Sequence, residues 1–146
     1  MTLDDYAGVT YDKPFDILIH SCETTTFVSQ VVSDVKTAVS TVKTETFSDF
    51  QIQQEVDDPK IDCGPITYTL LGDTGPTPPT YLSLVLPYDI QLDGSNSADE
   101  TPTPVPVRLF MELEHYPGIV TWEESFTVWI YGCAGAEITP VHWNGI

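Results

Sequence analysis

Apolar and polar residues alternate in short runs along much of the chain. In the last of these runs, Phe126, Val128 and Ile130 alternate with Thr127 and Trp129. A period of two places successive side chains on opposite faces of an extended strand. We therefore expect strands at five segments, which are residues 65–71, 81–86, 88–92, 105–113 and 124–131.

Two further strands are expected nearer the start of the chain, at residues 24–32 and 35–42. Both segments are dense in β-branched residues, which favour an extended backbone over a helix. The spacing of Val35, Val39 and Val42 also suits a short helix, so this alternative stays open for the second segment.

Loops rich in proline, glycine or acidic residues separate the predicted strands, at residues 72–79 and 93–100. Tyr116 lies between the last two strands, where its ring is expected to cover the end of the fold and bond to the backbone. About seven short strands at this spacing, without a strong helix signal, predict an all-β fold, an immunoglobulin-like β-sandwich.

Both ends of the chain carry the same sequence pattern. Residues 10–22 align without a gap on residues 121–133 and keep threonine, an aromatic residue, an acid, phenylalanine, a β-branched residue, isoleucine and cysteine at matching positions. Phe15, Ile17 and Ile19 thereby repeat the apolar face of the last predicted strand.

This repeat divides the chain into three parts. Residues 1–22 resemble the last strand of a preceding repeat and form an N-terminal strand extension. Residues 23–133 form the β-sandwich, and residues 134–146 form a C-terminal tail or a junction to a next unit. A strand that ends another unit is expected to complete or extend a sheet in a neighbouring copy, where its alternate side chains fill pockets.

Short motifs run through nearly the whole chain: Phe15-x-Ile17-x-Ile19-x-x-Cys22, Phe47-Ser48-Asp49, Asp62-Cys63-Gly64-x-x-x-Tyr68, Glu112-Leu113-x-x-Tyr116-Pro117 and Phe126-x-Val128-x-Ile130-x-x-Cys133. This set resembles the tandem immunoglobulin/cadherin-like repeats of very large surface proteins of ciliates and other aquatic protists. The resemblance implies an all-β repeat used in arrays, in which the cysteine that closes one unit opens the next. It implies a disulfide between Cys22 and Cys63, with Cys133 as the opening cysteine of a following unit.

The residues themselves leave the state of the three cysteines open, because any single bridge leaves one over. A bond between Cys22 and Cys63 would close a loop of about 40 residues and stabilise the fold by about 3–4 kcal/mol. The alternative is three free thiols in a reducing compartment. If Cys22 and Cys63 are bridged, Cys133 is a free thiol or a covalent link to the next unit. Zinc is not expected, because the spacings typical of zinc ligands are absent from the sequence.

The charge of the chain narrows the choice of partners. There are 22 acidic residues against five lysines and arginines, which gives a net charge of -17. Nucleic acids and anionic membranes are therefore excluded as partners, and no apolar run is long enough for membrane insertion. Abundant threonine and serine with little lysine, together with the cysteine pattern, predict an extracellular or cell-surface location.

Threonines beside prolines are candidates for O-glycosylation, although plain proline-rich loops explain the pattern equally well. These candidates are Thr77, Thr80, Thr101 and Thr103. No cofactor is expected. Calcium is a weaker hypothesis than the attached sugars. Its ligands would be oxygen atoms of Asp57, Asp58 and Asp62, or of Asp93, Asn96 and Asp99.

The sequence contains no GxSxG elbow, phosphate-binding glycine loop or HExxH pair, so we do not expect an enzyme. The leading hypothesis is a structural subunit of an extracellular filament, assembled head-to-tail through strand addition between copies. A variant is one continuous array in which the repeats are covalently joined. The alternative function is a cell-surface adhesin or carbohydrate-binding module that stacks sugars on Trp122, Trp129 or Trp143.

Overall fold

The computed structural model describes residues 13–15, 17, 19–85 and 88–132. These residues form seven strands, one short α-helix and one turn of 3₁₀-helix. In chain order they are β1 (Val35–Ala38), β2 (Val42–Thr46), α1 (Gln53–Asp57), β3 (Ile66–Gly72), β4 (Leu82–Val85), β5 (Asp89–Asp93), η1 (Ser97–Asp99), β6 (Val105–Leu113) and β7 (Thr121–Tyr131).

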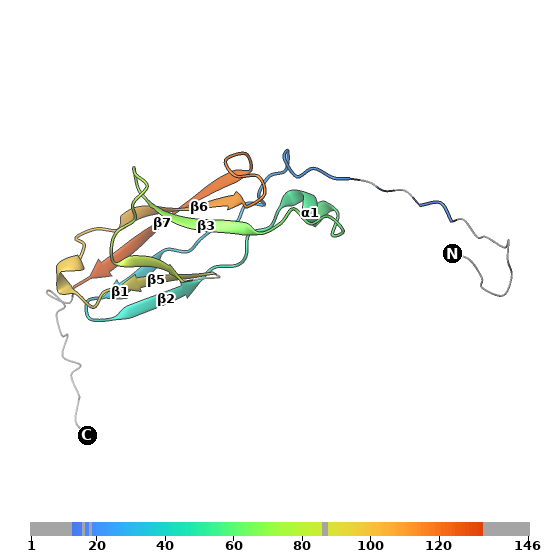
Figure 1. Cartoon of the computed structure of the whole chain (residues 1–146). Coiled ribbons are helices and arrows are strands. Elements are labelled where there is room, and N and C mark those ends of the chain that lie inside the picture. The colour runs from blue at the N-terminus through green and yellow to red at the C-terminus, as the bar shows by residue number, and fades with distance from the viewer. Residues whose placement is uncertain (1–12, 16, 18, 86–87, 133–146) are drawn as a thin grey trace, which may run out of the picture.

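The strands form two facing sheets (Figure 1). One sheet has the order β1-β7-β6-β3, in which β1 runs parallel to β7 and the other pairs are antiparallel. The other sheet has the antiparallel order β2-β5-β4. This arrangement confirms the expectation of an immunoglobulin-like β-sandwich of about seven strands.

The centre of the core is built by β6 and β7. Their inward side chains alternate with outward ones, and Leu109, Met111, Val128 and Ile130 are completely buried. Burying an aliphatic side chain of this size stabilises a fold by about 1.5–3 kcal/mol. The buried side chains of these two strands, which the predicted alternation turns inward, therefore contribute strongly to the stability of the fold. The strand β7 begins earlier than predicted, at Thr121.

Residues 24–32 were expected to form a strand, and this prediction is wrong. The segment makes a single bridge, between Phe27 and Ile52. The backbone bonds around it join Val28 to Gln51 and Gln53 to Thr26. Because the partner chain turns into α1 at Gln53, the ladder has no further residues to pair with.

The helical alternative for residues 35–42 is also wrong. The first part forms β1, which pairs in parallel with the end of β7. The chain then reverses at Ser40, whose φ of 71° lies in the left-handed region, and continues as β2. The β-branched side chains thus outweigh the helical spacing of the valines.

The sequence did not predict α1, which has only five residues. Tertiary contacts hold it, since its Gln54 donates an N–H to the Thr25 hydroxyl at 3.3 Å and the buried Ile52 precedes it. No helix in the part of the chain that the structure describes is long and apolar enough to cross a membrane.

A disulfide between Cys22 and Cys63 closes the α1 end of the sandwich. The two Cα atoms are 5.6 Å apart, and both residues are buried. The backbone N–H of Cys22 also donates to the Tyr116 hydroxyl at 3.3 Å. The structural role expected for Tyr116 is therefore confirmed. Cys22, at which the chain enters the sandwich, is bound both to the β6–β7 turn and to the segment before β3.

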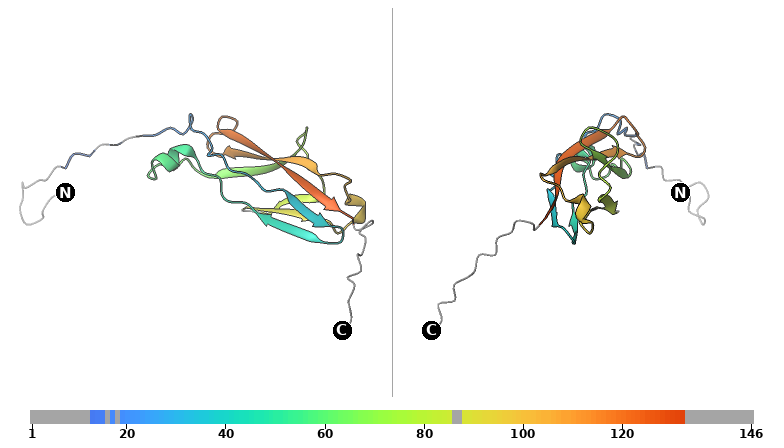
Figure 2. Two further views of the ribbon diagram at one scale, coloured as in Figure 1. Left: turned by 180° about the vertical axis from the view of Figure 1, so that it is seen from behind. Right: turned by 90° about the vertical axis from the view of Figure 1, so that its left-hand side faces the viewer.

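The two described ends of the chain lie at opposite ends of the sandwich (Figures 1 and 2). The segment that carries Phe15, Ile17 and Ile19 leaves beside α1. The last strand, β7, ends at the far end. The N-terminal apolar segment and the end of β7 are therefore separated by the length of the sandwich.

Replacing both cysteines, as Cys22→Ser with Cys63→Ser, is expected to lower the free energy of unfolding by about 3–4 kcal/mol, because the unfolded chain loses a cross-link. Urea unfolding followed by tryptophan fluorescence measures this change. Reductant should destabilise the natural chain by a similar amount and leave the double variant unaffected. A natural chain whose unfolding midpoint ignores reductant would contradict the prediction.

Candidate functional site

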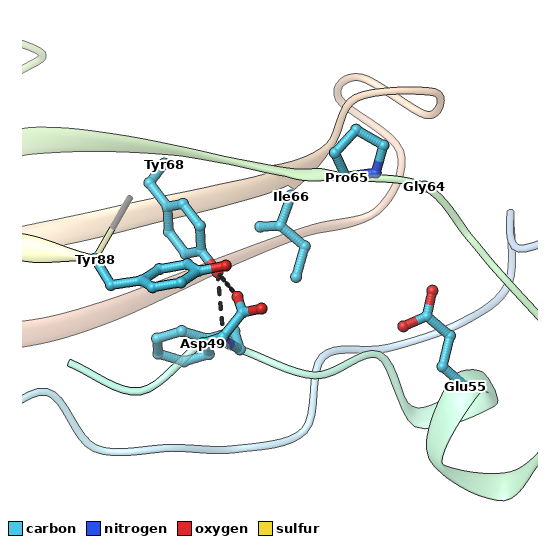
Figure 3. A pocket seen from close by; sticks show the side chains of 8 residues that line it. Asp49, Glu55, Gly64, Pro65, Ile66, Tyr68 and Tyr88 are labelled. Carbon is cyan, nitrogen blue, oxygen red and sulfur yellow. Dashed lines mark hydrogen bonds between the residues drawn. The ribbon is translucent and has the colours of Figure 1, made fainter. Parts of the chain in front are cut away.

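A cleft of about 320 Å³ opens between the start of β3 and the segments that precede α1 and β5 (Figure 3). We call it the β3 cleft. It is lined by Asp49, Phe50, Glu55, Gly64, Pro65, Ile66, Tyr68 and Tyr88. Its walls are aromatic and aliphatic, and two carboxylates lie among them.

The position of β3 at the edge of its sheet explains why this cleft is open. Alternation turns Ile66, Tyr68 and Leu70 toward the other sheet. Leu70 is buried there, whereas Ile66 and Tyr68 are only half-buried. Since β3 has no neighbour on its outer side among the described strands, these two side chains form an accessible wall.

An aromatic cluster forms the floor of the β3 cleft. The Tyr68 ring meets Phe47 at 5.4 Å and Tyr88 at 5.9 Å between ring centroids, both edge to face. The Phe50 ring packs against the rings of Phe47 and Tyr68. Edge-to-face pairs of this kind add about 0.5–1.5 kcal/mol each beyond simple burial, so the floor is rigid.

Asp49 connects this cluster to polar groups. The Tyr68 hydroxyl donates to Asp49 Oδ1 at 2.6 Å and accepts the Phe50 N–H at 3.3 Å (Figure 3). Burial, and then the bond to Asp49, raise the pKa of Tyr68 well above its ordinary value. The Asp49 carboxylate likewise raises the pKa of Tyr88. Both phenols therefore stay protonated around a fixed carboxylate.

The second carboxylate of the cleft comes from α1. Glu55 Oε1 accepts the N–H of Cys63 at 2.7 Å, which ties α1 to the disulfide. The next residue, Gly64, has a φ of 92°, a conformation that side chains rarely allow, and donates to Asp62 at 2.9 Å. This arrangement suits a ligand with an apolar body and a cationic or hydrogen-bond-donating group.

This site was not predicted from the sequence. Phe47-Ser48-Asp49 and Tyr68 belong to the motifs of the resemblance, but Glu55 and Tyr88 belong to none of them. The lining comes from segments far apart in the chain, so only the sheet topology brings it together.

The predicted inter-subunit strand is the second candidate surface. Phe15, Ile17 and Ile19 are 80%, 76% and 89% exposed. At the matching positions of β7, Phe126 and Val128 are 4% and 0% exposed. The same apolar face is thus core in β7 and uncovered in the N-terminal segment.

The candidate glycosylation sites differ in accessibility. Thr77, Thr80 and Thr103 are exposed. The Thr101 hydroxyl is buried and has no hydrogen-bond partner within the described chain, while its backbone N–H bonds to Ile130 at 2.9 Å. A transferase cannot reach this hydroxyl in the folded state, so the structure argues against Thr101 as a sugar site.

Of the tryptophans proposed as stacking platforms, Trp129 already contacts other residues of the chain. Trp129 is half-buried, donates its indole N–H to the Thr101 carbonyl at 3.1 Å and packs edge to face on Tyr131. Trp122 is 37% exposed. Trp143 lies outside the described residues, as does Cys133.

Within the described ranges, no three His, Cys, Asp or Glu side chains gather as a metal site. Four of the six side chains proposed for calcium cap their own turns. Asp58, Asp62, Asp93 and Asn96 each accept a backbone N–H from two residues further along the chain.

Together, the topology and core define an immunoglobulin-like β-sandwich. No family model matches the chain, and no curated protein matches its sequence. Among solved structures, the chain is similar to titin domain M7, at 9% sequence identity, over 73% of this chain and 94% of that one, with a TM-score of 0.45. A likeness at this level concerns the fold alone.

Tyr68→Phe is expected to lower the free energy of unfolding by about 1–3 kcal/mol, because it leaves the Phe50 N–H and Asp49 without their partner. Tyr131→Phe is the matched control, since Tyr131 is 41% exposed. That control should change stability by less than about 0.5 kcal/mol. Equal effects of the two variants in urea unfolding would contradict the assigned role of Tyr68.

The free energy of unfolding is also expected to fall as the pH rises above about 10. Tyrosines of the unfolded chain ionise there, whereas the raised pKa of Tyr68 keeps it protonated in the folded state. Unfolding then releases protons and becomes easier at higher pH. Tyr68→Phe should flatten this fall in urea titrations between about pH 9 and 11, and an equally steep fall in that variant would contradict the prediction.

Proposed function

We propose that this chain is a structural module that joins copies head-to-tail into an extracellular filament, with residues 10–22 acting as a strand in the sandwich of a neighbouring copy. The observation that carries this proposal is the contrast between the two copies of one pattern. Ile130 of β7 is completely buried, whereas its counterpart Ile19 is 89% exposed.

An uncovered face of this kind is unfavourable in water. Each large apolar side chain gains about 1.5–3 kcal/mol when it is buried. Phe15, Ile17 and Ile19 follow the two-residue period of a strand, which is the form that a donor takes in strand addition. Main-chain hydrogen bonds would supply affinity, and the alternate side chains would supply specificity.

The placement of the described ends supports a head-to-tail order. The apolar segment leaves the sandwich beside α1, and β7 ends at the other end (Figure 2). A contact between different surfaces, repeated with a constant rotation, does not close on itself and gives a helical fibre.

The location and modification of the filament belong to the same proposal. A buried disulfide favours an oxidising compartment outside the cytosol. The exposed Thr77, Thr80 and Thr103 lie in proline-rich loops, where O-linked sugars would project from the module.

Phe15→Asp with Ile17→Asp is expected to weaken association between copies by at least about 100-fold, since two buried apolar side chains are lost. Analytical ultracentrifugation and electron microscopy should show monomers where the natural chain forms fibres. The control is Val31→Asp with Val56→Asp, two positions that are 85% and 47% exposed outside the segment. Fibres of normal length from the first variant would contradict the proposal.

The strand contact is the same whether the neighbouring copy is a separate chain or part of a continuous array. The two arrangements differ in the mass of the native polypeptide. A separate chain of this sequence has a mass of 16.2 kDa before modification, and a continuous array has a mass several times larger. Mass spectrometry of native fibres under reducing conditions distinguishes them.

A further inference from the structure

We propose that the β3 edge and the β3 cleft of one copy receive residues 13–19 of the next copy as an added strand, parallel to β3. This inference rests on the proposed function, because it names the acceptor of the strand described there. It follows from comparing the edges of the two sheets, the free backbone groups of β3, the contents of the cleft and the direction of the chain.

The other edges are less suited to receive a strand. On β2, Lys43 and Glu45 stand opposite the buried Leu92 and Ile90, so these charges lie on the core-facing side of the sheet. Inward-pointing charges are a known means of blocking edge-to-edge pairing. The edge strands β1 and β4 have only four residues each. By contrast, β3 has seven residues and no charge.

None of the described strands lies on the outer side of the first half of β7, because β1 pairs only with Val128–Tyr131. The side chain of Asp34, which directly precedes β1, already occupies this edge of β7. Asp34 accepts the N–H of Thr127 at 2.7 Å. An added strand there would have to displace a charge-assisted hydrogen bond, which is the stronger kind.

The free backbone groups of β3 can be assigned from its pairing with β6. The Glu114 N–H donates to the Pro65 carbonyl at 3.0 Å, so Pro65 turns its carbonyl toward β6. In an antiparallel ladder this orientation alternates along the strand. Ile66, Tyr68 and Leu70 therefore direct their N–H and C=O groups to the open side.

The same three residues turn their side chains toward the β3 cleft and the core. A strand added at this edge would place alternate side chains in the gap between the sheets. The cleft of about 320 Å³ is roughly twice the size of a cavity that accommodates benzene, which is about 150 Å³. It therefore has room for the Phe15 ring against Tyr68 and Tyr88.

Head-to-tail order fixes the direction of the added strand. The incoming Cys22 lies at the far end of the acceptor, where β7 ends, and the residues before it reach back toward α1. Since β3 also starts beside α1 and runs to the far end, the two strands are parallel. In that direction Lys13 comes first, and it shares a face with Phe15 and Ile17.

Charge agrees with this direction. Lys13 would lie beside Ile66, which Figure 3 shows between Asp49, on the Tyr68 side of the cleft, and Glu55, on α1. Phe15 would follow beside Tyr68, and Ile17 beside Leu70. An antiparallel strand would instead take the lysine to the Gly72 end of β3, away from Asp49 and Glu55, where Arg108 donates to the Gly72 carbonyl at 3.1 Å.

Photocrosslinking tests the acceptor. The full chain is made with p-benzoylphenylalanine in place of Phe15, assembled and irradiated, and the linked peptides are identified by mass spectrometry. We expect links to residues 47–50, 64–70 and 88, whereas the same photoreactive residue in place of the exposed Val31 should give none of them. Assembly with links to β2, β4 or β7 would overturn the acceptor and leave the filament intact. Failure of the natural chain to assemble would overturn the filament as well.

A charge reversal tests the direction. Lys13→Glu is expected to weaken association at least tenfold, because it sets a third carboxylate beside Asp49 and Glu55. Lys36→Glu makes the same change in net charge at another exposed lysine and should leave association nearly unchanged. Equal weakening by the two variants in ultracentrifugation would mean that net charge alone decides, and would overturn the placement of Lys13.

Discussion

The structure depends on one requirement, which is that a strand with apolar residues at every second position must have that face covered. In β7 this cover comes from the facing sheet, with β6 and β1 paired on either side. Phe126, Val128 and Ile130 are consequently among the most buried side chains. Phe15, Ile17 and Ile19 repeat the pattern of β7 without this cover. Under the proposed function, the requirement that builds the fold would therefore also drive association between copies.

The ends and edges of the sandwich show how the rest of the chain adapts to this core. At the α1 end, where the strands stop, the Cys22–Cys63 disulfide and the Tyr116 hydroxyl hold the entering chain in place of apolar packing. At the edges, charges at Lys43 and Glu45 protect β2, whereas β3 has no such protection. In the proposed filament, this asymmetry between a guarded edge and an open one would give the association a single direction.

Strands that pair with a long partner were predictable from sequence, because their alternation reflects a buried face. The segment 105–113 became β6 with the predicted bounds. The strand predicted at residues 24–32 did not form, because the chain paired with it at Ile52 turns into α1. That helix depends on distant contacts rather than on a local pattern. The β3 cleft was not predictable for the same reason, because Asp49, Tyr68 and Tyr88 meet only through topology. The exposed apolar residues Phe15, Ile17 and Ile19 could be identified from the sequence because a repeat is visible without any structure.

The net charge of -17 limits what kind of contact can hold such copies together. Like-charged modules repel one another at distances up to the Debye length, about 8–10 Å at physiological salt. Association therefore has to come from short-range contacts, which buried side chains and backbone hydrogen bonds supply. In the proposed filament of a chain so poor in basic residues, a lysine at the start of the donor strand and two carboxylates in the acceptor cleft would favour one register and one direction. Repulsion elsewhere on the surface would then discourage lateral contacts and keep growth along a single axis.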